Sequence, residues 1–125
     1  MKTIHYQFDI PAPAEEVYRA ITNPFTIELW SGFSAEMKLE KESEFSLFDG
    51  DISGKVIDFE ENKLLKQEWF FGDQEEKSVV TMTLKGKGEK THVDLLHENI
   101  PEEAFEDMKV GWKKYYWGAI LKFFK

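Results

Sequence analysis

The chain has 125 residues, with 24 acidic and 16 basic side chains and a formal net charge of -8 at pH 7. This excess of negative charge repels nucleic-acid phosphates and anionic lipid head groups, which argues against nucleic acid or a membrane as a partner. Hydrophobic residues make up 42% of the chain and aromatic residues 15%, which is enough apolar material for a folded core. The absence of cysteine excludes disulfides, thiolate nucleophiles and thiolate metal sites.

The same features set expectations for location and size. Residues 1–6 show no apolar region typical of a secretion signal, and no apolar run reaches the length of a membrane span. We therefore expect a soluble, cytoplasmic protein. A second domain would leave each half with a marginal core, so the sequence predicts one domain over residues 1–125.

The chain opens with a predicted strand over residues 4–10, where apolar residues occupy every second position. Two short helices follow. Pro13 suits the first turn of the first helix, and Pro24 suits that of the second. Asn23 can cap the second helix and Gly32 can end it. The sequence thus predicts a strand followed by two short helices.

Residues 37–100 have the pattern of strands, because apolar residues recur at every second position between turn signals. The clearest breaks fall at Asp49-Gly50, Glu61-Asn62 and Gly86-Lys87-Gly88. An antiparallel meander with one continuous apolar face is the economical interpretation. The inward positions on that face are Phe45, Leu47, Leu65, Gln67, Trp69, Phe71, Val80, Met82, Leu84, Val93, Leu95 and His97.

The last segment, residues 101–124, predicts one long amphipathic helix. Pro101 suits its first turn, acidic residues gather at its N-terminal end, and lysines gather at its C-terminal end, as the helix dipole prefers. Its apolar stripe is formed by Phe105, Met108, Trp112, Tyr115, Ala119 and Phe123, with Ala104, Tyr116 and Ile120 at the flanks.

This order of elements predicts an α+β fold. An antiparallel sheet of about six strands is expected to curve around the C-terminal helix, because that arrangement buries the apolar faces of both.

Several motifs resemble those of a known family. Residues 45–54 show its strand-turn-strand pattern of an aromatic pair, Asp-Gly, a hydrophobic residue, Ser and Gly, and residues 66–71 resemble its Trp-bearing strand. Residues 13–18 and 100–103 also agree, as does the pattern Gly-Trp followed by a tyrosine pair in residues 111–116. On these motifs the sequence resembles the C-terminal domain of the activator of the heat-shock protein 90 ATPase, within the START-like (SRPBCC) helix-grip superfamily.

The resemblance implies a helix-grip fold and a non-enzymatic binding module with a co-chaperone or stress-response role. Its expected partner is a chaperone of the heat-shock protein 90 family. In the eukaryotic activator, a separate N-terminal domain makes a major chaperone contact, and the resemblance here is to the C-terminal domain alone. The superfamily's shared trait is a cavity for an apolar ligand, so a carrier or sensor of a small hydrophobic ligand is the alternative.

The signature residues of the last helix have two interpretations. Trp112 and Tyr115 fall on the predicted core stripe, which favours packing. Tyr116 lies at the margin of the stripe, where a large amphipathic ring suits a binding surface. We therefore expect Tyr116 to be a partner-binding residue.

The space between sheet and helix is the candidate ligand cavity. Gln67, Trp69 and His97 should point into it, where an amide and an imidazole could orient a polar group of a ligand. Alternatively, Gln67 and His97 are satisfied core polar groups, bonded to each other or to a tyrosine hydroxyl. The candidate cavity residues are Trp30, Phe33, Met37, Phe45, Gln67, Trp69, Met82, His97, Met108, Trp112 and Tyr115.

No pattern indicates a metal or a cofactor. The histidines lack zinc spacing, and Asp49-Gly50-Asp51 lacks the further oxygen ligands of a calcium loop, so we expect a hairpin turn there. No serine lies in a nucleophile pattern, and we expect no enzyme. The remaining enzyme hypothesis is a cyclase or hydrolase in which His97 acts with Tyr115 or Tyr116.

Overall fold

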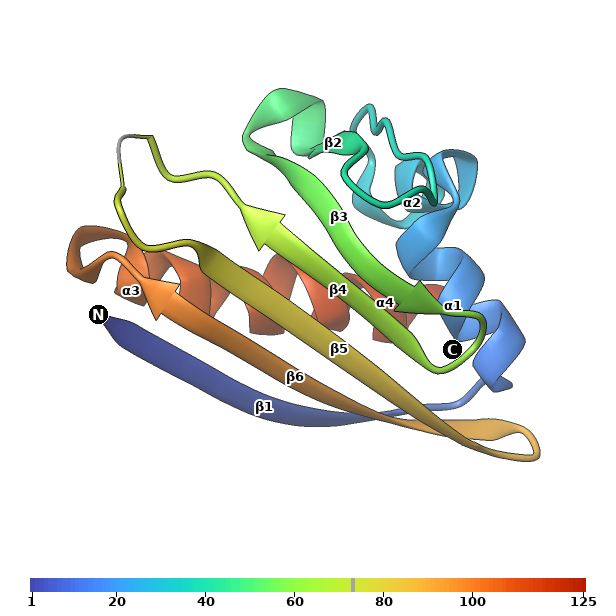
Figure 1. Cartoon of the computed structure of the whole chain (residues 1–125). Helices are drawn as coiled ribbons and strands as arrows, with labels where there is room; N and C mark the ends of the chain where they lie inside the picture. Colours follow the sequence, from blue (N-terminus) through green and yellow to red (C-terminus); the bar gives the residue numbers. More distant parts are fainter. Residues whose placement is uncertain (73) are drawn as a thin grey trace.

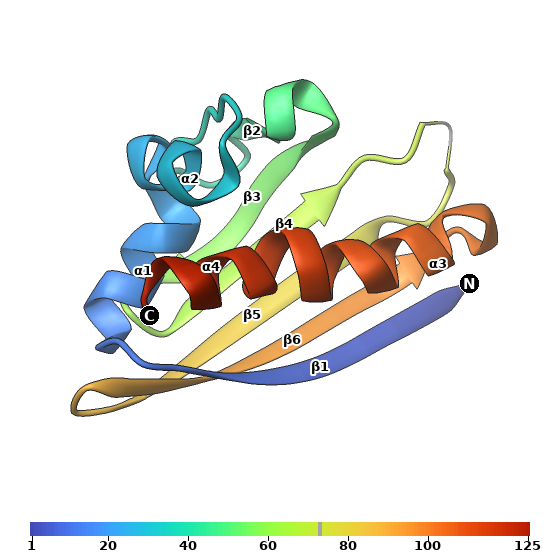
Figure 2. The ribbon, with the colours of Figure 1, turned by 180° about the vertical axis from the view of Figure 1, so that it is seen from behind.

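The alternating segments form six antiparallel strands, and the long amphipathic segment forms a helix that crosses one face of their sheet (Figures 1 and 2). The structure is a computed structural model that describes residues 1–72 and 74–125. The elements are β1 (Lys2–Ile10), α1 (Ala14–Thr22), α2 (Pro24–Ser31), β2 (Glu44–Leu47), the 3₁₀ turn η1 (Phe48–Gly50), β3 (Ile52–Glu60), β4 (Leu64–Trp69), β5 (Ser78–Lys87), β6 (Lys90–Ile100), α3 (Glu102–Val110), the π-helical turn η2 (Gly111–Tyr116) and α4 (Trp117–Phe123). The predicted α+β arrangement is confirmed.

The strands follow the order β1-β6-β5-β4-β3-β2 in one sheet, so β2 to β6 form the predicted meander and β1 pairs with its end. The register places Gln67 of β4 opposite Val80 of β5, and Val80 opposite His97 of β6. Directly opposed residues point to the same side of a sheet. These three side chains therefore form one row across the inner face, and all three are fully buried.

The second short helix begins and ends where the sequence predicts, and the first begins directly after Pro13. The side chain of Asn23 accepts a hydrogen bond from the backbone N–H of Thr26 at 3.1 Å, which caps α2. Gly32 ends α2 in the left-handed conformation, with φ of 81°. Helix α1 packs on β5 and β6, whereas α2 packs on α4, so the short helices close one end of the core (Figure 1).

The long helix contains one irregular turn, η2. There the backbone N–H of Trp117 bonds to the carbonyl of Trp112, five residues earlier, where an α-helix would use four. A Cβ at Gly118 would lie 2.2 Å from the carbonyl oxygen of Lys113. Glycine is therefore required at this position of α4, directly after the turn. The helix still runs along the sheet from α3 to α4 (Figure 2).

The extra residue in η2 changes which side chains the helix buries, because one residue corresponds to about 100° of rotation. The predicted stripe is correct as far as Trp112, which is buried. It is wrong beyond that point, since Tyr115 is 56% exposed and Phe123 is 41% exposed. The residues one position further along face the sheet instead, and the fully buried ones are Tyr116, Trp117 and Ile120.

Candidate functional site

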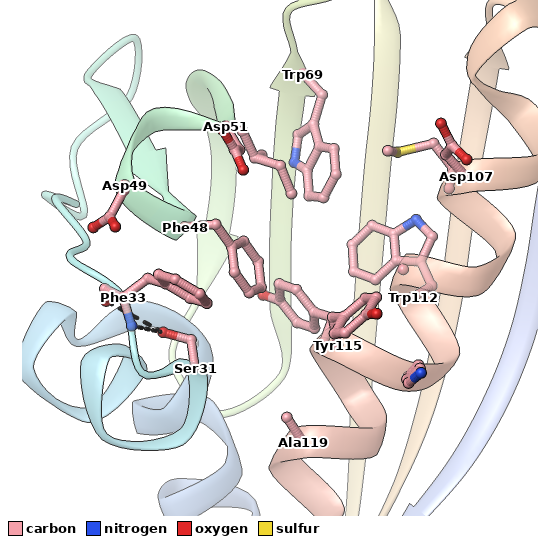
Figure 3. A pocket seen from close by; sticks show the side chains of 15 residues that line it. Ser31, Phe33, Phe48, Asp49, Asp51, Trp69, Asp107, Trp112, Tyr115 and Ala119 are labelled. Carbon is pink, nitrogen blue, oxygen red and sulfur yellow. Dashed lines mark hydrogen bonds between the residues drawn. The ribbon is translucent and has the colours of Figure 1, made fainter.

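An open pocket lies where the middle of the C-terminal helix faces the turn η1 and the end of α2 (Figure 3). Its volume is about 590 Å³, within the range of sites for small organic ligands. Its lining residues are Ser31, Phe33, Phe48, Asp49, Asp51, Ile52, Trp69, Asp107, Met108, Gly111, Trp112, Lys114, Tyr115, Tyr116 and Ala119.

Aromatic rings form much of the pocket wall. Trp69 of β4 and Trp112 of the helix stack with ring centroids 4.8 Å apart and planes inclined by 26°. Across the pocket, the rings of Phe33 and Phe48 lie 6.1 Å apart, and Tyr115 extends beside them (Figure 3). Such a wall favours ligands with an apolar body.

The π-helical turn determines which of the two adjacent tyrosines, Tyr115 or Tyr116, is exposed. Tyr115, expected in the core, stands exposed at the pocket mouth, whereas Tyr116, expected at the surface, is only 2% exposed. The expectation that Tyr116 offers an accessible ring to a partner is therefore wrong. The reason is the rotation introduced by η2, which exchanges the places of the two rings.

The ring of Tyr116 packs between Trp30 and Trp112, at centroid distances of 5.0 Å and 4.7 Å. Burial raises the pKa of its hydroxyl well above the usual range. Among the described residues, this hydroxyl has no hydrogen-bond partner. An unpaired buried hydroxyl costs about 1–3 kcal/mol of stability.

His97 is held in a chain of hydrogen bonds beneath the pocket. Trp112 Nε1 donates to His97 Nδ1 at 3.0 Å, so the imidazole proton must lie on Nε2. His97 Nε2 then donates to Ser78 Oγ at 2.8 Å, and that hydroxyl donates to the carbonyl of Glu98 at 3.1 Å. Burial lowers the pKa of His97 to about 3. The ring is therefore neutral, and both of its nitrogens are occupied.

This arrangement corrects the expectation that His97 faces a ligand. His97 does not line the pocket, and it offers no free nitrogen to act as a base with Tyr115 or Tyr116. Gln67 Oε1 accepts a hydrogen bond from Trp69 Nε1 at 3.0 Å, whereas its buried Nε2 has no partner among the described residues. The two polar residues thus bond to tryptophans, and the expected bonds to each other or to a tyrosine are not formed.

The turn η1 holds Phe48 over the pocket in an uncommon backbone conformation. Phe48 and Asp49 have φ values of 53° and 56°, in the left-handed region that bulky residues rarely adopt. Asp49 Oδ1 accepts hydrogen bonds from the N–H and the hydroxyl of Ser34 at 2.7 Å and 2.6 Å. The bond from the Ser34 hydroxyl is the main cause that lowers the pKa of Asp49. The predicted turn at Asp49-Gly50-Asp51 is confirmed, and a side-chain clamp stabilises it.

Charged groups stand at the pocket mouth. Asp51 and Asp107 are exposed and lie on either side of Trp69, whereas Asp49 is turned away from the pocket (Figure 3). Lys114 places its ammonium nitrogen 5.3 Å from the centroid of the Tyr115 ring. The lining thus contains three carboxylates and one ammonium group.

The pocket brings together part of the predicted cavity set. The predicted residues that line it are Phe33, Trp69, Met108, Trp112 and Tyr115. The others pack away from the pocket within or against the core, namely Trp30, Met37, Phe45, Gln67, Met82 and His97. Trp30, for example, donates its Nε1 hydrogen to the carbonyl of Ala20 at 2.7 Å.

Sequence reasoning missed other residues of the lining. These are Ser31, Phe48, Asp49, Asp51, Ile52, Asp107, Gly111, Lys114 and Ala119. Phe48 offered a signal, because a large aromatic residue directly before an Asp-Gly turn has no place in the strand alternation. Asp51, Asp107 and Lys114 lie at solvated positions of the pattern, where nothing in one sequence marks a binding role.

Among the described residues, 1–72 and 74–125, no helix is both long and apolar enough to cross a bilayer. Nor do three or more of their His, Cys, Asp or Glu side chains gather where they could hold a metal ion.

A curved antiparallel sheet that grips a long C-terminal helix, with a pocket beside that helix, defines a START-like domain. A scan against family models matches residues 11–124 to the family described as "Activator of Hsp90 ATPase homolog 1-like protein". This match spans nearly the whole chain, and the chain belongs to that family.

Sequence similarity to individual proteins supports this assignment. The chain is 26% identical over 112 residues to the human activator of 90 kDa heat shock protein ATPase homolog 1, a match covering 88% of this chain and 33% of that protein. It thus spans about a third of the length of the curated relatives it matches.

Solved structures extend the likeness to the whole fold. An HSP90 activator from Plasmodium falciparum has a TM-score of 0.88 at 26% identity, covering 96% of this chain and 94% of the other. A protein from Mesorhizobium loti has a TM-score of 0.82 at 25% identity, covering 97% and 95%.

Proposed function

We propose that this chain is a non-enzymatic module that binds a chaperone of the heat-shock protein 90 family and acts as a co-chaperone. The observation that carries this proposal is the family match over residues 11–124, supported by the likeness to the Plasmodium activator. The chain corresponds to about a third of the human activator. Binding to the chaperone and stimulation of its ATPase are therefore separate parts of the proposal.

The pocket mouth is the surface we assign to this contact. Tyr115 and Phe33 are 56% and 50% exposed, and large rings of this kind dominate the energetics of protein interfaces. The net charge of -8 would draw a basic patch of the partner toward them. We further propose a cytoplasmic location, which the lack of cysteine supports.

The test uses the purified chain and the heat-shock protein 90 chaperone from the same organism. We expect saturable binding by calorimetry, and we expect Tyr115→Ala to weaken it by about five-fold or more. Phe25→Ala is the matched control, since Phe25 is 70% exposed on α2 and does not line the pocket. The chaperone's ATPase rate, measured in parallel, reports stimulation. Absence of binding at high micromolar concentration would reject the proposal.

A carrier or sensor of a small hydrophobic ligand is the second candidate function. It is favoured by the aromatic pocket of about 590 Å³. NMR chemical-shift mapping against a library of lipids and aromatic compounds tests it. Ala119→Leu should reduce binding by filling the pocket, whereas Ala104→Leu on the same helix lies outside the lining. Shifts confined to the outer face of the sheet would count against this function.

A further inference from the structure

Aromatic rings gather in the pocket wall. Trp69 and Trp112 are buried in it, Phe48 is half-buried, and Phe33 and Tyr115 are exposed (Figure 3). The face of an aromatic ring carries partial negative charge, so it attracts a cation as well as an apolar group. The pocket already shows such an interaction, since the ammonium of Lys114 lies over the Tyr115 ring.

The charges at the mouth have the same sign as the ring faces. Asp49 is turned away from the pocket, so the charged groups at the mouth are the carboxylates of Asp51 and Asp107 and the ammonium of Lys114, which leaves a formal charge of -1. Asp49 is engaged by Ser34, but Asp51 and Asp107 form no ion pair with any of the described residues. Two unpaired carboxylates therefore flank an aromatic surface, an arrangement that favours positive charge in the space between them.

We infer that the pocket selects organic cations, in which an ammonium group is attached to an apolar body. The apolar body would contact Trp69 and Trp112, and the ammonium group would lie at the mouth near Asp51 and Asp107. This inference rests on the proposal that the pocket binds a small ligand, and it specifies the charge of that ligand.

The test compares three probes of similar size by NMR titration of the intact chain. Benzyltrimethylammonium is the cation, neopentylbenzene is its neutral isostere, and benzenesulfonate is an anion. We expect saturable shifts at Gly111, Lys114 and Tyr115 with the cation. The isostere should bind about five-fold more weakly, as expected for a cation–π contribution, and the anion more weakly still.

Variants distinguish the effect on cation binding of the charge at the pocket mouth from the effect of the overall charge of the protein. The double change Asp51→Asn and Asp107→Asn should weaken cation binding by about three-fold and leave the isostere unaffected. Asp9→Asn is the control, since Asp9 lies in β1 and pairs with His92 away from the pocket. The spectrum of each variant without probe confirms its fold.

Each outcome decides between the proposals. Three results would overturn the charge selectivity and leave the ligand-binding function standing. They are equal binding of the cation and the isostere, tighter binding of the anion, and a loss of cation affinity in Asp9→Asn equal to that in the double variant. If no probe shifts the pocket resonances, both the selectivity and the ligand-binding function fail. Chaperone binding, measured separately, is not affected by either result.

Discussion

The imidazole of His97 is fully buried, with Trp112 as a donor on one nitrogen and Ser78 as an acceptor on the other. A second ring proton would place an N–H against the N–H of Trp112, and it would put a charge in the core. The folded protein therefore resists protonation, with a pKa of about 3, whereas an unfolded chain protonates near 6.5. As the pH falls below about 6.5, the unfolded state takes up the proton first.

The contribution of His97 to stability is therefore complete above about pH 6.5 and is lost as the pH falls toward 3. We expect the free energy of unfolding to decrease by up to about 1.4 kcal/mol per pH unit from this group alone. Denaturant unfolding at a series of pH values measures the slope. His97→Asn keeps an acceptor for Trp112 and removes the titration, so its slope should be shallower. Equal slopes in both proteins would contradict this prediction.

For single residues, the alternation of the strands was enough to predict which polar side chains point inward. It placed Gln67 and His97 on the inner face correctly, because a period of two fixes the face of each residue. It could not supply their partners. Trp112 reaches His97 from another element, so the bond depends on how the helix lies across the sheet.

The C-terminal helix depends on a glycine at a single position, Gly118. Gly118 allows the carbonyl of Lys113 to approach within a distance that no side chain permits. Gly111, the first residue of η2, has open space around it and φ of -59°. The two glycines, one at the start of η2 and one in α4 just after its end, therefore have opposite requirements.

We expect Gly118→Ala to lower the free energy of unfolding by roughly 2 kcal/mol or more, because the added methyl group overlaps a backbone carbonyl. Gly111→Ala should be neutral or raise it by about 0.5–1 kcal/mol, since alanine is the better helix former. Chemical denaturation of both variants measures the difference. Similar stabilities for the two would show that η2 does not depend on Gly118.

The sequence predicted this helix but not its irregular turn. The apolar stripe that begins at Phe105 and the one that ends at Ile120 and Phe124 differ in phase by one residue. The predicted stripe keeps the phase of the first along the whole helix. A glycine inside a helical segment, such as Gly118, was the available signal that the backbone comes close to another group. The misplacement of Tyr115 and Tyr116 follows from that missed change of phase.

Over the whole molecule, the net charge of -8 has an effect on stability. Mutual repulsion among acidic side chains favours the expanded unfolded chain, and dissolved salt screens that repulsion. We expect the melting temperature at pH 7 to rise by a few degrees between low and moderate NaCl. The control is the same comparison near the pH at which the charges balance, where the rise should vanish. A melting temperature insensitive to salt at pH 7 would contradict the prediction.

The order of elements was predictable because each segment has a clear period and clear breaks. The pocket was not, since its wall includes the rings of Phe33, Phe48 and Tyr115, and Tyr115 is far from the other two in the sequence. Their meeting depends on the left-handed turn at Phe48 and on the π-helical turn before Trp117. Local periodicity contains neither of these conformations.

The turn η2 also has a consequence for comparing this chain with its relatives. An uninterrupted α-helix would need one residue fewer between Trp112 and Ile120 to bury the same side chains. The turn is thus equivalent to a one-residue insertion, and a single wider turn of the helix accommodates the extra residue. Relatives with a regular helix should align with a one-residue gap here. Without that gap, an alignment would equate Tyr115 of the pocket mouth with a core residue.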